Sequence, residues 1–306
     1  MSFSSNVKRE LLGIEDGARH CGIAELSAIL ICCGEFFTYN GSTGLRIRSE
    51  NYHACVKCAR LIKRLFGFSA EVSVKDRGRH FFIYIGDFDA AKRVLNSTGL
   101  GVPERDGVSP LVVSGVCCRQ AYIRGAFLAS GSVSDPEKTY HAEFISDRLN
   151  VAETLLNIVN SFSLNAKLLR RKENYIVYLK DSEQITDLLN IMRAHRSLLA
   201  LAGVRVVKGV RNNVNRKVNF EAANLSKTIS ASVKQFEDIN FIKETRGLSF
   251  LNEQLREAAE LRLTHPEASL KEIGMMPGEP VSKSGMNHRF RKISEIADYI
   301  RTDSKC

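Results

Sequence analysis

Leu26-Ser27-Ala28-Ile29-Leu30-Ile31-Cys32-Cys33-Gly34 and Ile123-Arg124-Gly125-Ala126-Phe127-Leu128-Ala129-Ser130-Gly131 are two versions of one pattern. Each is an apolar run with small residues that ends in Gly, and such a run predicts a buried helix. Cys21 and Gly34 recur as Cys118 and Gly131 at the same offset of 97 residues. The chain therefore contains an internal repeat, and the repeat decides how the rest is interpreted.

Both copies, about residues 20–100 and 117–195, predict the same succession of helices and strands. The pattern in each is αββαββα, which favours antiparallel sheets with helices on one face and an α+β fold. The first copy is expected to form helix 24–33, a strand pair within 41–49, helix 52–66, strands 70–75 and 81–85, and helix 88–95. The second is expected to form helix 122–129, a strand at 140–145, helix 150–162, strands 166–171 and 175–179, and helix 182–194.

The paired helices resemble the signature of the LAGLIDADG homing endonucleases. In an active enzyme of that kind, an acidic residue stands just before the Gly that ends each helix. Here Cys33 and Ser130 replace the acidic residues, so we expect no catalytic residue, because Mg²⁺ requires hard oxygen ligands. Residual endonuclease activity is the weaker alternative, and it would need Glu35 or Asp135 to reach the cleft. We expect Gly34, Gly125 and Gly131 to permit close approach of the two helices.

Composition restricts the class of protein and its partners. The 306 residues carry a formal net charge of +10, and 44% of them are hydrophobic. No run of 18 apolar residues occurs and the N-terminus lacks a secretory core, so a cytoplasmic protein with no membrane partner is expected. Excess positive charge favours nucleic acid as the partner, with an anionic membrane surface or an acidic protein as alternatives.

The chain has eight cysteines. Cys55-Val-Lys-Cys58 has metal-ligand spacing, but a structural zinc site needs four ligands. The pairs Cys32-Cys33 and Cys117-Cys118 are adjacent in sequence, and one such pair cannot easily clasp an ion. We therefore expect the cysteines to be buried apolar side chains and surface thiols, with no metal and no cofactor. Zinc binding and a redox switch are the weaker alternatives.

A basic segment follows the repeat. Residues 203–247 contain nine Lys and Arg against four Asp and Glu, together with several Asn. Both Arg and Asn donate hydrogen bonds to phosphates and bases. A helix is predicted over 222–239, and a solvated connector is the alternative to DNA contact.

Basic residues also follow the strands of both copies, around Lys75, Arg77 and Arg79 in the first. The predicted secondary DNA contacts are Lys208, Arg211, Asn212, Asn215, Arg216, Lys217, Lys227, Arg170, Arg171 and Lys172.

Residues 248–306 have the pattern of a helix-turn-helix domain. A helix over 252–263 ends at His265-Pro266, and Ser269 with Glu272 has the spacing of a capping box that starts a short helix. Two Gly and two Pro in 274–280 predict a turn. A helix over 283–301 follows, with one apolar stripe at Met286, Phe290, Ile293, Ala297 and Ile300.

The opposite face of that last helix is basic and amide-rich in its N-terminal half, as expected for a recognition helix in the major groove. An ordinary amphipathic helix with a solvated face is the alternative. The residues predicted to contact DNA are Ser282, Lys283, Ser284, Asn287, His288, Arg289, Arg291 and Lys292. The motif spans about residues 269–302.

Several longer segments resemble the bacterial WhiA family, and the likeness extends over nearly the whole chain. They are the opening Ser2-Phe3-Ser4 and the stretches 124–138, 211–216, 223–228 and 281–289. The resemblance implies a degenerate homing-endonuclease domain (1–202), a connecting segment (203–247) and a helix-turn-helix domain similar to region 4 of sigma factors (248–306). It also implies a role in cell division and chromosome segregation, and in sporulation in some bacteria.

The sequence therefore predicts a non-catalytic, sequence-specific DNA-binding protein that regulates transcription and associates with the nucleoid. Double-stranded DNA is the expected partner. The alternative is a regulator that acts by protein contact, with RNA polymerase, another regulator or the division machinery as its partner.

Overall fold

The computed structural model describes residues 2–39, 42–75, 78–100 and 107–303. The chain divides into two compact units, residues 1–208 and 209–306. The three-part division at residues 202 and 247 stays a prediction. Arg77, which was named among the basic residues that follow the strands, and Cys306, one of the eight cysteines, lie outside the described residues.

The first unit contains the αββαββα succession twice, as predicted, after an N-terminal helix α1 (Phe3–Leu12) that the sequence analysis did not anticipate. The first copy consists of α2 (Arg19–Cys33), β1 (Gly34–Tyr39), β2 (Ser42–Ser49), α3 (Tyr52–Phe66), β3 (Val72–Lys75), β4 (His80–Ile85) and α4 (Phe88–Ser97). The second consists of α5 (Val116–Ser130), β5 (Gly131–Val133), β6 (Ala142–Ser146), α6 (Leu149–Asn160), β7 (Lys167–Arg171), β8 (Asn174–Leu179) and α7 (Ser182–Ile191).

Each copy forms one four-stranded antiparallel sheet. The strand orders are β1-β2-β4-β3 and β5-β6-β8-β7, so the two sheets have the same topology. Side chains alternate between the two faces of each strand. Leu45 and Ile47 of β2 are buried beneath helices, whereas Arg46 and Arg48 lie on the opposite, uncovered face. This confirms the expected α+β fold with helices on one side of each sheet.

Helix α2 belongs to the cores of both copies. Leu26, Ile29 and Leu30 pack with the first sheet, whereas Ala24 and Ile31 pack in the core of the second copy. A helix that contacts apolar groups on most of its circumference needs no polar face. This explains why residues 26–34 are almost uniformly apolar.

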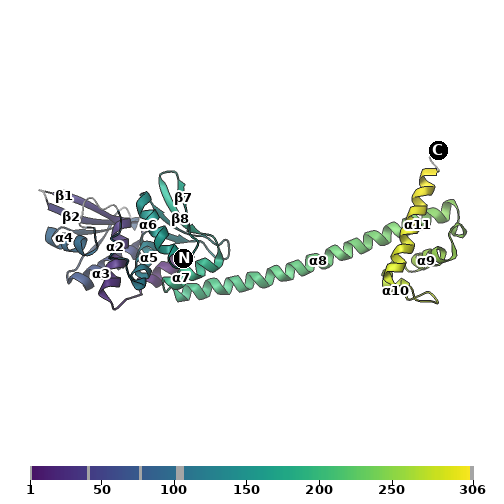
Figure 1. The fold of residues 1–306 in the computed structure, drawn as a ribbon, viewed down its shortest axis with the longest axis horizontal. Helices are drawn as coiled ribbons and strands as arrows, with labels where there is room; N and C mark the ends of the chain where they lie inside the picture. Colours follow the sequence, from purple (N-terminus) through teal and green to yellow (C-terminus); the bar gives the residue numbers. More distant parts are fainter. Residues whose placement is uncertain (1, 40–41, 76–77, 101–106, 304–306) are drawn as a thin grey trace. The chain divides into compact units, whose positions relative to one another are not determined.

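Helices α2 and α5 pack side by side at the centre of the first unit (Figure 1). A Cβ built on Gly125 would lie 3.0 Å from the Cβ of Ala28 and closer still to the carbonyl oxygen of Glu25. Gly34 and Gly131 instead end their own helices, and a Cβ at either would meet the preceding turn, at Leu30 and Phe127. Of the three glycines predicted to permit helix approach, Gly125 alone has the other helix as its neighbour.

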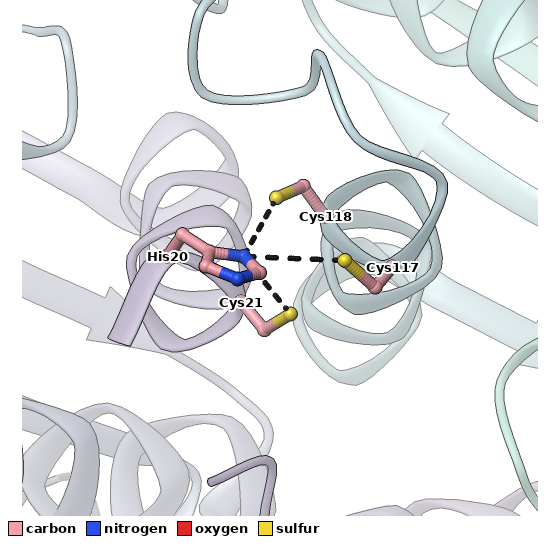
Figure 2. Close-up of side chains that lie close together, drawn as sticks. All are labelled: His20, Cys21, Cys117 and Cys118. Atoms are coloured by element: carbon pink, nitrogen blue, oxygen red, sulfur yellow. Dashed lines mark hydrogen bonds between the residues drawn. The ribbon is translucent and has the colours of Figure 1, made fainter. Parts of the chain in front are cut away.

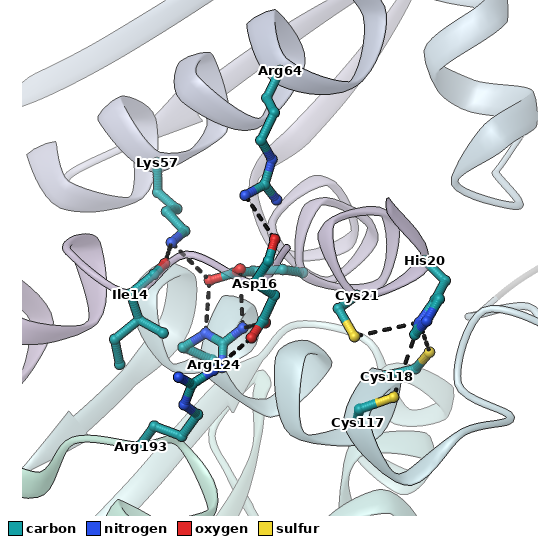
Figure 3. A network of polar contacts seen from close by, with 11 residues as sticks. Ile14, Asp16, His20, Cys21, Lys57, Arg64, Cys117, Cys118, Arg124 and Arg193 are labelled. Carbon is teal, nitrogen blue, oxygen red and sulfur yellow. Dashed lines mark hydrogen bonds and ion pairs between the residues drawn. The ribbon is translucent and has the colours of Figure 1, made fainter. Parts of the chain in front are cut away.

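Buried charges connect these two helices. Arg124 and Glu25 are each about 1% exposed at the side chain, and the Arg124 Nε donates to Glu25 Oε1 at 3.0 Å. Lys57 Nζ lies 3.4 Å from the same oxygen, and Arg124 also pairs with Asp16 (Figure 3). Desolvation of such charges is costly, so each must keep its partners. The interface between α2 and α5 is called the seam below. The cluster fixes how the repeats face each other at this end of the seam.

Helix α8 (His195–Thr245) runs through all but the last two residues of the predicted connecting segment. Every residue from Gly209 to Ser230 is exposed. Because no core lies beside this stretch, no apolar periodicity marks it, and the prediction of a helix over 222–239 alone was too short. Leu225, Ile229 and Val233 are all exposed.

The second unit packs the end of α8 with three further helices, α9 (Glu253–Thr264), α10 (Leu270–Gly274) and α11 (Lys283–Asp303), after a short 3₁₀ turn at Leu248–Phe250. All five residues of the predicted stripe on α11 are buried. The capping box is confirmed, since Ser269 Oγ accepts from the Glu272 backbone and Glu272 Oε2 accepts from the Ser269 backbone. Among the described residues, no helix combines the length and apolar content needed to span a membrane.

Candidate nucleic-acid interface

The N-terminal half of α11 presents the polar face that the sequence predicted. Ser282 Oγ accepts the Gly285 backbone N–H at 3.1 Å and so caps the first turn. A helix start of this kind concentrates N–H groups and favours a nearby phosphate. Seven of the eight predicted contact residues are exposed: Ser282, Lys283, Ser284, Asn287, His288, Arg291 and Lys292.

Arg289 is the exception on this helix. Its Nη1 lies 3.3 Å from both the Gln254 carbonyl oxygen and Glu257 Oε2, and the residue is only partly exposed. The guanidinium therefore contacts α9 and does not project with the other seven side chains. Its contact with α9 helps to orient α11, and Arg289 stays only a predicted DNA contact.

Two polar contacts hold α11 against the end of α8. The carboxylate of Asp238, which is 1% exposed, accepts from Ser294 Oγ at 2.6 Å and pairs with Arg301 at 2.7 Å. On the α9 side, the guanidinium of Arg262 is buried, lies 5.2 Å from the ring centre of Phe290 and donates to the Ala268 carbonyl. Burial lowers the pKa of Arg262. These contacts make α11 a rigid platform for its exposed face.

The turn before α11 depends on one glycine. The Val281 N–H donates to the Gly274 carbonyl at 2.7 Å, which closes the turn between α10 and α11. A Cβ on Gly274 would lie 3.3 Å from the Val281 carbonyl carbon and closer still to its oxygen. Only glycine permits this approach of backbone to backbone.

The predicted contacts on α8 divide by position. At about 100° per residue, six of the seven fall within an arc of about 160° on one side of the helix, and Lys217 lies outside that arc. Lys208 differs from the others, because its Nζ donates to the Pro136 carbonyl at 2.7 Å and lies 5.0 Å from the Tyr140 ring centre. The other five on that side are Arg211, Asn212, Asn215, Arg216 and Lys227, all exposed.

The strand alternation separates the basic residues of the second sheet. Leu168 packs towards the core, so Arg170, two residues on, belongs to the helix-covered face, where it lies 5.8 Å from the Tyr175 ring centre. Arg171 is on the open face, and Lys172 is in the hairpin turn with φ of 57°. The three consecutive residues therefore do not form one patch.

The open face of the first sheet carries basic and aromatic side chains that the site prediction omitted. Arg48 and Lys75 are exposed there, and Lys75 Nζ lies 5.4 and 5.8 Å from the ring centres of Phe82 and Tyr84. The alternation Leu45-Arg46-Ile47-Arg48 is the sequence signal that points to this face. Arg46 is bound to Glu35 through a 2.6 Å hydrogen bond, so Glu35 is engaged on the sheet.

The positions that hold the acidic residues in LAGLIDADG enzymes line an open pocket of about 640 Å³ beside α1. Cys33 and Ser130 lie there with Lys8, and among the described lining residues Glu50 is the one carboxylate. Burial, followed by the neighbouring Cys32, raises the pKa of Cys33 to about 12. Burial lowers the pKa of Lys8 to about 8. The pocket is thus lined mainly by neutral and basic groups. Asp135, the other carboxylate that residual endonuclease activity would need, is exposed, and it accepts a hydrogen bond from the Glu137 backbone N–H at 3.0 Å.

Cys55 and Cys58, the pair with metal-ligand spacing, are both fully buried in the first core. Burial raises the pKa of Cys55 to about 11. Both side chains occupy apolar packing positions, as the sequence analysis expected.

The architecture defines the class of protein: a duplicated LAGLIDADG-like domain without the paired acidic residues, followed by a helix-turn-helix domain. Family profiles agree over most of the chain. Residues 19–81 match the WhiA N-terminal LAGLIDADG-like domain, residues 119–211 the WhiA LAGLIDADG-like domain, and residues 214–297 the WhiA C-terminal HTH domain.

Curated relatives match nearly end to end. The chain is 46% identical to the probable cell division protein WhiA of Thermoanaerobacter pseudethanolicus, with 98% of each chain covered. It is 43% identical to the protein of the same name from Lachnoclostridium phytofermentans, covering 98% of this chain and 100% of that one. The chain therefore belongs to the WhiA family.

Two solved structures share the fold. Full-length WhiA from Thermatoga maritima aligns with a TM-score of 0.62 at 24% identity, covering 98% of this chain and 99% of that one. A crystal structure of the N-terminal LAGLIDADG domain of WhiA aligns with a TM-score of 0.51 at 20% identity, covering 62% of this chain and 92% of that one.

Proposed function

We propose that this WhiA-family protein is a non-catalytic, sequence-specific DNA-binding regulator of transcription that acts in cell division and chromosome segregation. The observation that carries the proposal is the exposed Lys, Arg, His and amide face on the N-terminal half of α11, held rigidly on a helix-turn-helix core. Relatives that match nearly end to end are named probable cell division proteins, which supports the cellular role. A protein of this kind would associate with the nucleoid.

Within this proposal the exposed residues of α11 and those of α8 have different tasks. Asn287 and Arg291 can pair with adenine and guanine edges in the major groove, so they would specify sequence. The exposed residues on one side of α8, such as Arg211 and Arg216, would contact phosphates and add affinity without specificity. The open face of the first sheet, with Arg48 and Lys75, is a third surface that could contact the duplex backbone.

Binding of the full chain to duplexes enriched from a random pool tests the proposal. Affinity should fall linearly on a log–log plot against salt, since Lys and Arg displace condensed counterions. Arg291→Ala and Asn287→Ala should each weaken the enriched site by about 5- to 150-fold and leave random duplexes almost unchanged. Lys92→Ala on α4, exposed and on the helix side of the first sheet, is the matched loss of charge. An affinity that does not respond to salt, or equal losses for all three variants, would contradict the proposal.

We also propose that the first unit does not cleave DNA. The chemistry at the former acidic positions supports this, because a protonated thiol and a hydroxyl are poor ligands for Mg²⁺. Supercoiled plasmid incubated with the full chain and Mg²⁺ or Mn²⁺ should remain intact. Nicking that is lost on Glu50→Gln would refute the proposal, because Glu50 is the carboxylate among the described pocket residues.

Direct contact with RNA polymerase or another regulator stays a prediction. A pull-down with the Arg291→Ala variant would separate a protein partner from one recruited through DNA, since only the second should be lost with DNA binding.

A further inference from the structure

Four residues with soft or borderline donor atoms converge at one end of the central helix pair. His20 and Cys21 belong to the first turn of α2, and Cys117 and Cys118 belong to the first turn of α5 (Figure 2). The four donor atoms, one ring nitrogen and three sulfurs, all lie within 4.8 Å of one another. Sequence reasoning, which treats each adjacent pair separately, does not find this cluster.

The internal repeat explains why the cluster forms. His20 and Cys117 are equivalent positions of the two copies, and so are Cys21 and Cys118, because both pairs have the offset of 97 residues that relates the helices. A repeat that packs its central helices against each other brings equivalent helix starts together. Two adjacent pairs, neither able to enclose an ion alone, therefore face each other across the seam.

The distances suit a tetrahedral ion. His20 Nδ1 lies 3.2 Å from Cys118 Sγ, 3.3 Å from Cys21 Sγ and 4.0 Å from Cys117 Sγ. Zinc–sulfur bonds of about 2.3 Å and zinc–nitrogen bonds of about 2.0 Å at tetrahedral angles place neighbouring ligands about 3.5–3.8 Å apart. The observed separations lie on both sides of that value, so small side-chain rotations would complete the geometry.

We propose that His20, Cys21, Cys117 and Cys118 form a structural zinc site that joins the two repeats. Three thiolates and one imidazole are the ligand set of a closed Cys₃His zinc centre, whereas Mg²⁺ and Ca²⁺ take oxygen ligands. Zinc bound here replaces the thiol protons, which pass to solvent.

The surroundings favour an ion at this place. Cys21 and Cys118 are buried, whereas His20 and Cys117 are exposed, so two ligands anchor the site and two leave a path for entry. All four belong to helix first turns, where backbone N–H groups and the helix dipole favour thiolate.

This site is separate from the former catalytic positions. Cys21 and Cys33 are twelve residues apart on one helix, which corresponds to roughly 18 Å along its axis. The charged cluster of Arg124, Glu25 and Asp16 lies beside the same helices, and Figure 3 shows Arg124 and Asp16 near the four ligand residues. Zinc would fix the N-terminal ends of α2 and α5, and it would do so whether or not α11 binds DNA.

Metal titration of the full chain tests the site directly. The reduced, chelator-treated protein should take up about one Zn²⁺ per chain in competition with a chromogenic chelator. Co²⁺ should give the thiolate charge-transfer and visible bands of a tetrahedral sulfur-rich centre. Cys117→Ser and His20→Asn alter exposed ligands and should preserve the fold, which circular dichroism checks. Loss of an outer-sphere partner already weakens metal binding about 10- to 100-fold, so each variant should lose at least that much.

Cys33→Ser is the matched control, because it makes the same exchange at the opposite end of α2 and should bind zinc as the wild type does. Zinc at a hundred times its dissociation constant should also raise the melting temperature of the first unit by about 5–10 °C in wild type and control, and not in Cys117→Ser or His20→Asn. Failure of the reduced wild type to bind zinc, or equal affinity in the ligand variants, overturns the proposal. A disulfide between Cys21 and Cys118 in a chain that takes up no zinc after reduction would likewise overturn it.

Discussion

Gly125→Ala should weaken the packing of the two central helices more than its single methyl group suggests. The added Cβ would lie 3.0 Å from the Ala28 Cβ and 3.1 Å from the carbonyl carbon of Glu25, with the carbonyl oxygen closer still. Carbon atoms pack best at about 3.5–4.0 Å. Since the obstacle is helix backbone and cannot rotate away, α2 and α5 must separate by on the order of 1 Å.

The magnitude follows from two opposing effects. Overpacking a close-packed interior costs about 3 kcal/mol when backbone must move. Replacing a helical Gly by Ala contributes about 1 kcal/mol of helix propensity in the other direction. The free energy of unfolding of the first unit should therefore fall by about 2 kcal/mol, and its melting temperature by about 4–8 °C for a unit of this size.

The matched control is Gly203→Ala in α8. A Cβ at Gly203 would meet nothing within 4 Å, so this variant should stabilise the first unit by about 0.5–1 kcal/mol. Differential scanning calorimetry of the full chain would measure both changes. If Gly125→Ala melts at or above the wild-type temperature, the seam is not packed as closely as the structure places it, and the reasoning fails.

Arg124→Ala removes a buried guanidinium and should lower the free energy of unfolding, measured with urea, by about 3–5 kcal/mol, because the carboxylate of Glu25 stays buried with only part of its compensation. Arg193→Ala removes a half-exposed partner of Asp16 and should lower it by less than about 1 kcal/mol. Equal losses in the two variants would contradict this distinction. Ser269→Ala should destabilise the second unit by about 1 kcal/mol, measured by circular dichroism melting, since it removes one half of the capping box; an unchanged melting temperature would show that the box contributes nothing. Arg216→Ala should weaken binding to all duplexes alike and reduce the salt slope by about one ion, and a sequence-dependent loss would place this residue at the bases instead.

Much of the fold could be predicted because its signals are local. Helix α3 was predicted at the bounds that the structure gives, and both ends have local causes: Asn51 caps the start, and Gly67 ends it at φ of 81°. The capping box at Ser269 and the buried stripe of α11 are likewise decided by residues three or four apart. Helix α8 was underestimated for the opposite reason, since its exposed middle has no core to impose a period.

The candidate DNA-contact residues could be predicted only in part. Exposure of the α11 face follows from the period of its buried stripe, so seven of its eight residues are where the pattern placed them. Arg289 contacts Glu257 on another helix, and Arg170 and Arg171 point to opposite faces of a sheet. The first outcome depends on which helices become neighbours, whereas the second follows from the alternation of side chains along a strand.

The sequence by itself determined the duplication, the order of helices and strands, the loss of the acidic pair at Cys33 and Ser130, and the helix-turn-helix. These depend on periodicity, capping and residue chemistry within short windows. Only the tertiary structure decided that Gly125 has the other helix as its neighbour and that His20 and Cys21 meet Cys117 and Cys118. Contacts between residues about a hundred positions apart arise from how the two repeats pack, and no local pattern encodes that distance.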